Sequence, residues 1–381
     1  MPNNLTGENR PLTAESTMRL RLLAVPYCLR PIQLTALAAL IVLFSHAPTS
    51  AQLTVETVPP ATYESEDVPF GEYAPPSEGE PHYSSMADSG YWFLSTNNCP
   101  QSFDHTCPQF CPIVLRREQC DDFRRSSLAE LSGGLEPGVP VCIVIHGSFV
   151  DTPSACHESG FVWNWLRSAS CGNRMQMVYF SWPSFKPLSI FAANDVNILG
   201  RQAARNGYYL AELIQHIPPE CPICILGHSH GTRVASAGLH LMAGGRIQGI
   251  CHPFARANGR QIRTVFAAAA VDHNWLNPGK RYDRALYSTE CILNLTNCKD
   301  PALAVYPLRM PLFVKRPIGS TGLTGWDRRQ LGRMGTKIRD YDVSRAVGAS
   351  HLWPYYFRNN DLAMAMRNYV YFPDRITAAT N

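Results

Sequence analysis

A serine flanked by histidines and glycines is the part of this chain whose residue types could do chemistry. Residues 223–231 read ICILGHSHG, which places Ser229 at the centre of a G-x-S-x-G motif. An apolar, strand-like run precedes the motif and a helix-like pattern follows it. A serine on such a turn stands above the sheet, and the small residues at 227 and 231 let the strained backbone pack. We therefore expect Ser229 to be a nucleophile, with an ordinary glycine-rich turn as the alternative.

A second strand end lies about eighty residues upstream and could supply the amide groups that such a nucleophile needs. Residues 141–149 read VCIVIHGSF, so His146 and Gly147 directly follow an apolar run. The oxyanion formed in acyl transfer needs two preorganised N–H donors. The backbone amides of Ser148 and His230 are the candidates for this oxyanion hole. A plain turn after a strand is the alternative.

These segments resemble the motifs of α/β-hydrolases. The resemblance rests on IVIHGS at 143–148, FSWPS at 180–184 and LGHSHGTR at 226–233, and it covers the chain from about residue 91 to the C-terminus. The stretches GHSHGTRVASAGLHLMAGG and DVSRAVGASHLW are also similar to an uncharacterised branch of exported bacterial hydrolases. The resemblance implies the α/β-hydrolase fold and serine catalysis, but no substrate. His230 departs from the small or apolar residue of many relatives.

The same resemblance implies a catalytic histidine that follows the acid in the chain, because α/β-hydrolases use the order Ser, Asp or Glu, His. His351 fits this order, in a loop after a strand-like segment at 337–343. His273 precedes the best acid candidate and is disfavoured for that reason. A capping or packing histidine beside Trp353 is the alternative interpretation of His351.

Two aspartates are candidates for the acid. Asp300 follows a strand-like run at 292–295 and is our first choice. An aspartate followed by a proline is also a favourable helix N-cap, which is the alternative interpretation of Asp300. Asp272, at the end of the apolar run 264–271, is the runner-up. Either carboxylate would orient the imidazole of His351 and stabilise its cation.

The elements that must position these residues alternate between strands and helices. Short apolar runs bounded by turn residues predict buried strands at 141–145, 175–180, 223–226, 264–271 and 292–295. Apolar residues at helical spacing predict helices at 197–217 and 232–242. This alternation predicts an α/β fold, a mostly parallel, doubly wound sheet with helices on both faces.

The N-terminal segment has the layout of a signal peptide. Arginines from Arg19 to Arg30 precede an apolar stretch at 34–44, and small residues follow it up to Ala51. The stretch has about 11 residues, whereas a spanning helix needs about 20. We expect cleavage of 1–51 and a secreted or periplasmic protein, with Met18 favoured as the true start.

Composition divides the remaining chain into an acidic leader and a basic body. Residues 52–90 hold six Glu, two Asp and six Pro without Lys or Arg, and predict a disordered linker. The net charge is +2 for 1–51, −8 for 52–90 and +10 for 91–381, the predicted catalytic domain. Residues 301–350 alone carry a net charge of +6, which would concentrate anionic substrates or hold the protein at an anionic surface. A solvated loop is the alternative.

Thirteen cysteines are many for an intracellular enzyme, and removal of Cys28 with the leader leaves twelve. An even number in an exported chain favours disulfide bonds. Cys156 with Cys171, and Cys291 with Cys298, are close enough in sequence for local bridges. The CPIC segment at 221–224 indicates a buried thiol or a structural bridge rather than a zinc ligand.

Composition also limits the classes of function. A hydrophobic content of 45% and a charged content of 17% indicate an ordinary globular protein. No motif indicates a nucleic-acid partner, a nucleotide cofactor or a metal site. We expect a serine hydrolase that cleaves a small-molecule or lipid carboxylic ester. A non-catalytic binding or surface protein of the same fold, and an amidase or peptidase, are the alternatives. The oligomeric state stays open.

Overall fold

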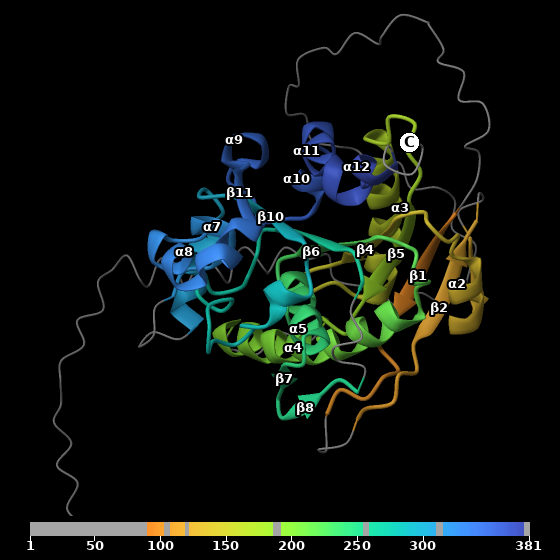
Figure 1. The fold of residues 1–381 in the computed structure, drawn as a ribbon, viewed down its shortest axis with the longest axis horizontal. Helices are drawn as coiled ribbons and strands as arrows, with labels where there is room; N and C mark the ends of the chain where they lie inside the picture. The colour runs from red at the N-terminus through yellow and green to blue at the C-terminus, as the bar shows by residue number, and fades with distance from the viewer. Residues whose placement is uncertain are drawn as a thin grey trace, which may run out of the picture.

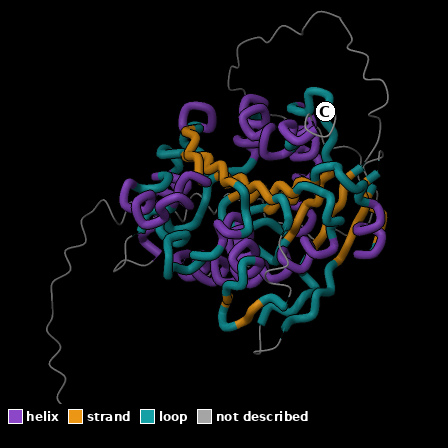
Figure 2. The backbone as a smooth tube through the Cα atoms, viewed as in Figure 1, coloured by secondary structure: helices purple, strands orange, loops and turns teal. Residues whose placement is uncertain are grey.

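A large, mostly parallel sheet forms the centre of the computed structural model (Figures 1 and 2). The structure describes residues 90–102, 107–118, 122–185, 192–253, 259–309 and 315–376. Within them, nine strands form one sheet in the order β11-β10-β9-β6-β4-β5-β1-β2-β3. The predicted signal peptide and, apart from Gly90, the predicted linker lie outside the described residues.

The elements alternate along the chain as the sequence predicts. The sheet strands are β1 (Tyr91–Ser95), β2 (Ile113–Arg117), β3 (Phe123–Ser126), β4 (Val141–Ile145), β5 (Gln176–Ser181), β6 (Ile223–His228), β9 (Ile262–Ala267), β10 (Cys291–Thr296) and β11 (Ile338–Asp342). A small hairpin consists of β7 (Arg246–Ile247) and β8 (Ile250–Cys251). The longer helices are α2 (Leu128–Gly134), α3 (Thr152–Ser168), α4 (Ala192–His216), α5 (Gly231–Met242), α8 (Gly325–Leu331) and α11 (Asn360–Val370). Shorter turns of helix are α6 (Pro301–Val305), α7 (Ile318–Thr321), α9 (Ser344–Val347), α10 (Pro354–Phe357), α12 (Pro373–Ile376), η1 (Ala285–Tyr287), η2 (Tyr306–Arg309) and η3 (Gly332–Lys337).

Every neighbouring pair of strands from β11 through β1 is parallel, and β2 and β3 extend that edge in antiparallel fashion. Helices cover both faces. Figure 1 shows α4 and α5 together on one face, and α3 with α11 on the other. The predicted doubly wound α/β fold is confirmed.

Alternate residues of the central strands fill two separate cores. Ile143 and Ile225 belong to the core that includes apolar residues of α4 and α5. Their neighbours Val144 and Leu226 belong to the core that includes residues of α3 and α11. A strand buried on both faces reads as a continuous apolar run, which is why the sequence reveals these strands.

The strand predicted at 264–271 ends early, and the reason concerns the site. β9 ends at Ala267, because Ala268 has a left-handed φ of 46°. The carbonyl of Ala267 accepts the amide of Ser229 at 2.9 Å, next to the last pair of β6 and β9, His228 and Ala267. The apolar run therefore continues beyond the strand and packs beside the serine turn.

The order of the strands reverses its direction between β4 and β6. The chain moves from β4 outward to β5, then crosses back over β4 to β6 and continues to β9. In such open sheets, ligands bind outside the carboxyl ends of the strands at the point where the direction reverses. His146 and Ser229 follow β4 and β6 directly, so both lie at this point.

The predicted disulfide bonds are wrong for the described residues, in which all eleven cysteines are free thiols. From Cys156 the helix α3 continues to Ser168, a rise of about 18 Å, and Cys171 lies beyond that end. Cys291 begins β10, which ends at Thr296 about 17 Å further along the strand, and Cys298 lies two residues beyond that end. Cysteines close in sequence are therefore kept apart by the element between them. The cysteine count no longer supports export, which rests on the N-terminal pattern alone.

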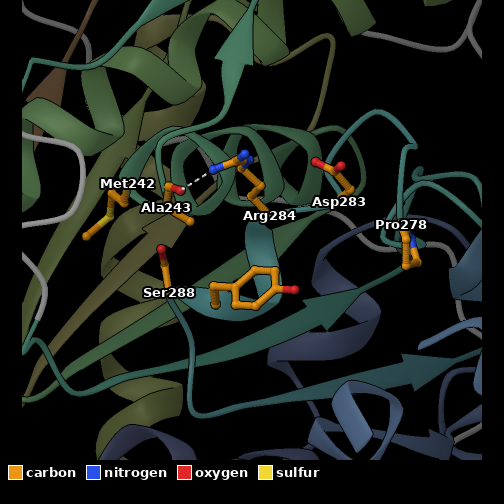
Figure 3. Close-up of a pocket in the computed structure, with 7 residues that line it drawn as sticks. Met242, Ala243, Pro278, Asp283, Arg284 and Ser288 are labelled. Atoms are coloured by element: carbon orange, nitrogen blue, oxygen red, sulfur yellow. Dashed lines mark hydrogen bonds between the residues drawn. The ribbon is translucent and has the colours of Figure 1, made fainter. Parts of the chain in front are cut away.

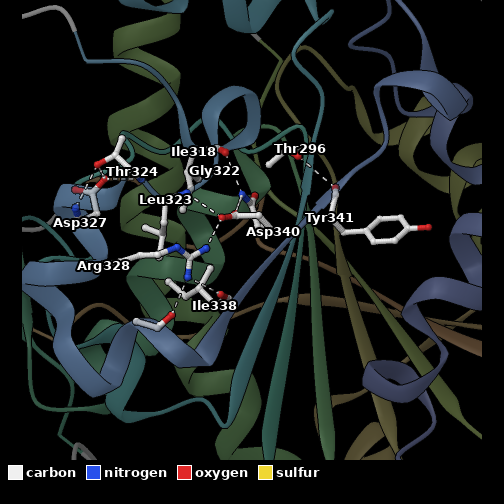
Figure 4. A network of polar contacts seen from close by, with 12 residues as sticks. Thr296, Ile318, Gly322, Leu323, Thr324, Asp327, Arg328, Ile338, Asp340 and Tyr341 are labelled. Atoms are coloured by element: carbon white, nitrogen blue, oxygen red, sulfur yellow. Dashed lines mark hydrogen bonds and ion pairs between the residues drawn. The ribbon is translucent and has the colours of Figure 1, made fainter.

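Part of the basic charge of 301–350 has a structural role. Figure 4 shows Arg328 of α8 pointing at Asp340 of β11. Nη2 of Arg328 lies 2.7 Å from Oδ2 of Asp340, and the amide of Leu323 donates to the same carboxylate. Lys337 donates to the carbonyls of Leu286 and Thr289. Other described cations of the segment are exposed, namely Lys315, Arg316, Arg329, Arg333, Arg339 and Arg345. The electrostatic prediction now concerns these exposed cations.

Candidate active site

Ser229 lies on a sharp turn between β6 and α5. Its φ of 51° is left-handed, a conformation that costs a non-glycine residue free energy and is found mainly at functional sites. A Cβ atom on Gly231 would lie 2.4 Å from the carbonyl oxygen of Ile145, and one on Gly227 would lie 2.9 Å from the backbone of Gly231. Only glycine fits at both positions, so the motif residues are those that this turn requires.

The side chains of Ser229, His351 and Asp300 form one chain of hydrogen bonds. Ser229 Oγ lies 2.9 Å from Nε2 of His351, and Nδ1 of His351 lies 2.7 Å from Oδ2 of Asp300. Each residue follows a strand or its connection at the same end of the sheet: β6 precedes Ser229, β10 precedes Asp300, and β11 precedes His351. The three residues predicted to be nucleophile, base and acid are thus brought together.

Asp300 satisfies both interpretations of its sequence context. Its Oδ1 accepts the amide of Leu303 at 3.0 Å and caps α6, while Oδ2 faces His351. The side chain is 1% exposed, so the carboxylate is held by these contacts rather than by solvent. The N-cap therefore fixes the oxygen that meets the imidazole.

The runner-up acid and the disfavoured histidine have other partners. Asp272 accepts the hydroxyl of Tyr306 at 2.8 Å. His273 Nδ1 lies 2.7 Å from Oδ2 of Asp327, a buried carboxylate that also accepts Asn277 and forms the capping box of α8 with Thr324. The structure gives neither Asp272 nor His273 a hydrogen bond to the side chains of Ser229 or His351 within the described residues.

The loop after β4 passes directly beside the serine. A Cβ atom on Gly147 would lie 2.9 Å from Nδ1 of His228 and 3.1 Å from Cβ of Ser229, so a larger residue here would force its neighbours to shift. The next residue is Ser148, whose Oγ lies 2.5 Å from Nδ1 of His230. The two residues whose amides are expected to form the oxyanion hole are therefore joined through their side chains.

His146 holds this loop in place, a role that sequence reasoning missed. The amide of Trp182 donates to Nε2 of His146, so the proton lies on Nδ1, which donates to the carbonyl of Gly147 at 2.8 Å. Burial lowers the pKa of His146 to about 4, so the ring is neutral near pH 7. A histidine directly after a buried strand was the only sequence signal for this role.

His228 and His230 flank the nucleophile and have different partners. His230 meets Ser148, whereas His228 Nε2 lies 2.9 Å from the carbonyl oxygen of His351. Among the described residues, no group of three His, Cys, Asp or Glu side chains is placed to hold a metal ion.

A cavity of about 470 Å³ lies at the far end of α5. Figure 3 shows it between the helix end at Met242 and Ala243 and the segment around Arg284 and Ser288. Because α5 begins two residues after Ser229 and has 12 residues, the cavity lies about 18 Å from the serine. It is separate from the candidate active site.

Comparisons with known proteins give weak likenesses only. No family model matches the chain, and no curated protein matches it. Among solved structures, the catalytic core of acetyl xylan esterase from Trichoderma reesei is 13% identical, with a TM-score of 0.30 over 61% of this chain and 98% of that one. A cutinase-like protein from Cryptococcus sp. is also 13% identical, with a TM-score of 0.26 over 62% and 95%. Scores this low carry no argument about function.

None of the helices in the described ranges is long and apolar enough to cross a membrane.

Proposed function

We propose that this chain is a serine hydrolase of the α/β-hydrolase type that cleaves carboxylic esters through an acyl-enzyme. The observation that carries this proposal is the hydrogen-bonded chain from Ser229 through His351 to Asp300, at 2.9 and 2.7 Å. A nucleophile, a base and a group that orients the base are the parts that nucleophilic catalysis needs.

Acylation begins with a proton transfer from Ser229 to His351. The contact with Asp300 keeps the imidazole proton on Nδ1, so the lone pair of Nε2 faces Ser229 Oγ. The serine oxygen attacks the ester carbonyl while Nε2 accepts its proton. The imidazolium is stabilised by Asp300 and then protonates the leaving alcohol.

The developing oxyanion would bind to the amides of Ser148 and His230. The 12-residue helix α5 points its N-terminus at the same place and favours negative charge there. Water then attacks the acyl-enzyme, again with His351 as the base, and releases the acid. This mechanism uses no cofactor.

The surface beside the imidazole favours a substrate with an apolar part. Leu352 and Tyr355 follow His351 and are 62% and 54% exposed. An ester with an aliphatic or lipid chain could cover them, whereas a small polar ester would leave them in water. The signal-peptide pattern of 1–51 supports a secreted or periplasmic location.

An ester and an amide of the same acyl group test the proposal. The wild-type protein should hydrolyse the ester, and Ser229→Ala should lose turnover while its thermal midpoint stays unchanged. Faster cleavage of the amide would favour a peptidase or amidase. A wild-type protein that binds the ester without turnover would favour a binding protein.

A further inference from the structure

The segment that carries His351 depends on contacts from other strands. Residues 348–353 contain no helix or strand, so their own backbone does not fix the imidazole. Asn297, after β10, donates to the carbonyls of Gly348 and Ser350 at 2.9 and 3.3 Å. These bonds hold the start of the segment, upstream of the histidine itself.

The second anchor comes from the residue beside the nucleophile. His228 ends β6, and its Nε2 lies 2.9 Å from the carbonyl oxygen of His351. Its ring stacks on Trp353 at 4.8 Å, and only 6% of the residue is exposed. A single side chain therefore contacts both the carbonyl of His351 and the residue two positions later.

The direction of this hydrogen bond is determined by its partner. A carbonyl oxygen can only accept, so His228 carries its proton on Nε2. Burial, and then the nearby His351, hold the pKa of His228 well below its ordinary value. His228 therefore stays neutral while His351 gains and loses its proton, and it is not a competing base.

The opposite edge of the ring meets the oxyanion loop. A Cβ atom on Gly147 would lie 2.9 Å from Nδ1 of His228. The imidazole thus fills the space between the loop after β4 and the segment that bears the base. Both loops must keep their distance from Ser229 for the reaction to proceed.

We propose that His228 is a positioning residue that holds the imidazole of His351 against Ser229 by donating a hydrogen bond to the His351 carbonyl. This inference rests on the proposed serine mechanism and adds to it a role for the residue before the nucleophile. A displacement of about 1 Å of a catalytic group can cost about 100-fold in rate.

Two amide substitutions of different length test the proposal. His228→Gln can place an N–H near the position of Nε2, whereas His228→Asn carries the same amide on a chain one methylene shorter. We expect His228→Gln to keep kcat within about threefold of wild type. His228→Asn should lower kcat by about 10- to 100-fold with little change in KM, because substrate binding does not involve this bond.

His240→Asn is the matched control. His240 is also a buried histidine, and its Nε2 lies 3.1 Å from the amide nitrogen of Arg246, but it lies near the far end of α5, roughly 14 Å from the turn. The His240→Asn variant should have a changed thermal midpoint, but it should not lose kcat as His228→Asn does.

The outcomes separate this inference from the proposed function. If Ser229→Ala retains wild-type turnover, the serine mechanism itself fails, and the positioning role fails with it. If Ser229→Ala is inactive but His228→Asn and His228→Gln have equal kcat, only the positioning role is overturned. Equal loss of kcat in His228→Asn and His240→Asn would overturn it as well.

Discussion

Replacing Asp300 by Asn should separate the two tasks of this carboxylate. One oxygen caps α6 through the amide of Leu303, and the other accepts Nδ1–H of His351. Asn keeps an oxygen for the cap, and Asn and Asp are about equally good N-caps. The other oxygen becomes an NH₂ group, which can only donate and therefore forces the proton of the imidazole onto Nε2.

The expected loss of turnover is large and the expected loss of stability is small, because each depends on a different oxygen of Asp300. With its proton on Nε2, His351 can no longer accept the proton of Ser229, and this change of tautomer costs about 10⁴ in turnover. The free energy of unfolding should change by less than about 1 kcal/mol in Asp300→Asn, since the cap persists. Asp300→Ala removes the cap as well, and should cost about 1 kcal/mol more.

The assay compares kcat for a chromogenic ester with the unfolding midpoint in urea. Asp272→Asn is the matched control, because Asp272 is also buried and accepts a hydroxyl from Tyr306 instead of an imidazole. Its kcat should stay within about threefold of wild type. A larger loss of kcat in Asp272→Asn than in Asp300→Asn would refute the assignment of the acid.

Three further predictions concern pH, salt and thiols. Burial raises the pKa of Glu158, which accepts the hydroxyl of Tyr179, to about 7. The folded state therefore binds the carboxyl proton more tightly than the unfolded state does. The resulting gain in the free energy of unfolding is full below about pH 4.5 and is lost as the pH rises to about 7. Between pH 4 and pH 8, Glu158 should lower the free energy of unfolding of the wild type by on the order of 3 kcal/mol, and Glu158→Gln should lack this part of the decrease. If urea unfolding gives the same difference between variant and wild type at both pH values, the prediction is wrong. The kcat/KM for an anionic ester should decrease with added salt, while that for a neutral ester of equal size should not. The reason is that ions screen the exposed cations of 301–350 over about 8–10 Å. Identical salt profiles for the two esters would show that this charge has no role in substrate choice. A reductant should leave the thermal midpoint unchanged, since the described cysteines are free, whereas loss of a bridge would cost about 2–5 kcal/mol.

The parts of the fold that sequence analysis predicts best are the strands buried on both faces. The runs at 141–145 and 223–226 are apolar throughout, and both coincide with strands of the sheet. The sequence analysis did not predict β1, although YWFLS is buried throughout. It also did not predict β2 and β3, whose sequences IVLRR and FRRS are short and basic and which lie next to and at the edge of the sheet, where such residues are exposed to water. Edge strands depend on a partner, which a local pattern does not reveal.

In the candidate site, too, sequence motifs revealed some residues, while contacts between distant segments stayed hidden. The chain order of the α/β-hydrolase resemblance selected Ser229, Asp300 and His351, and the structure brings their side chains together; their catalytic roles stay predictions. The carbonyl of His351, which His228 contacts, and the amide of Trp182, which His146 accepts, come from segments far away in the chain, so no spacing could predict these contacts. The disulfide prediction failed for a related reason, since short spacing in sequence ignored the elements that lie between the cysteines.

Covalent labelling of the serine tests the central claim most directly. A fluorophosphonate reacts with a serine only when a neighbouring base activates it, so the protein is incubated with the probe and the modified peptide is mapped by mass spectrometry. We expect one label per chain on Ser229, much slower labelling in His351→Gln, and none in Ser229→Ala. An unlabelled wild-type protein, or a label at another residue, would contradict the proposed serine mechanism.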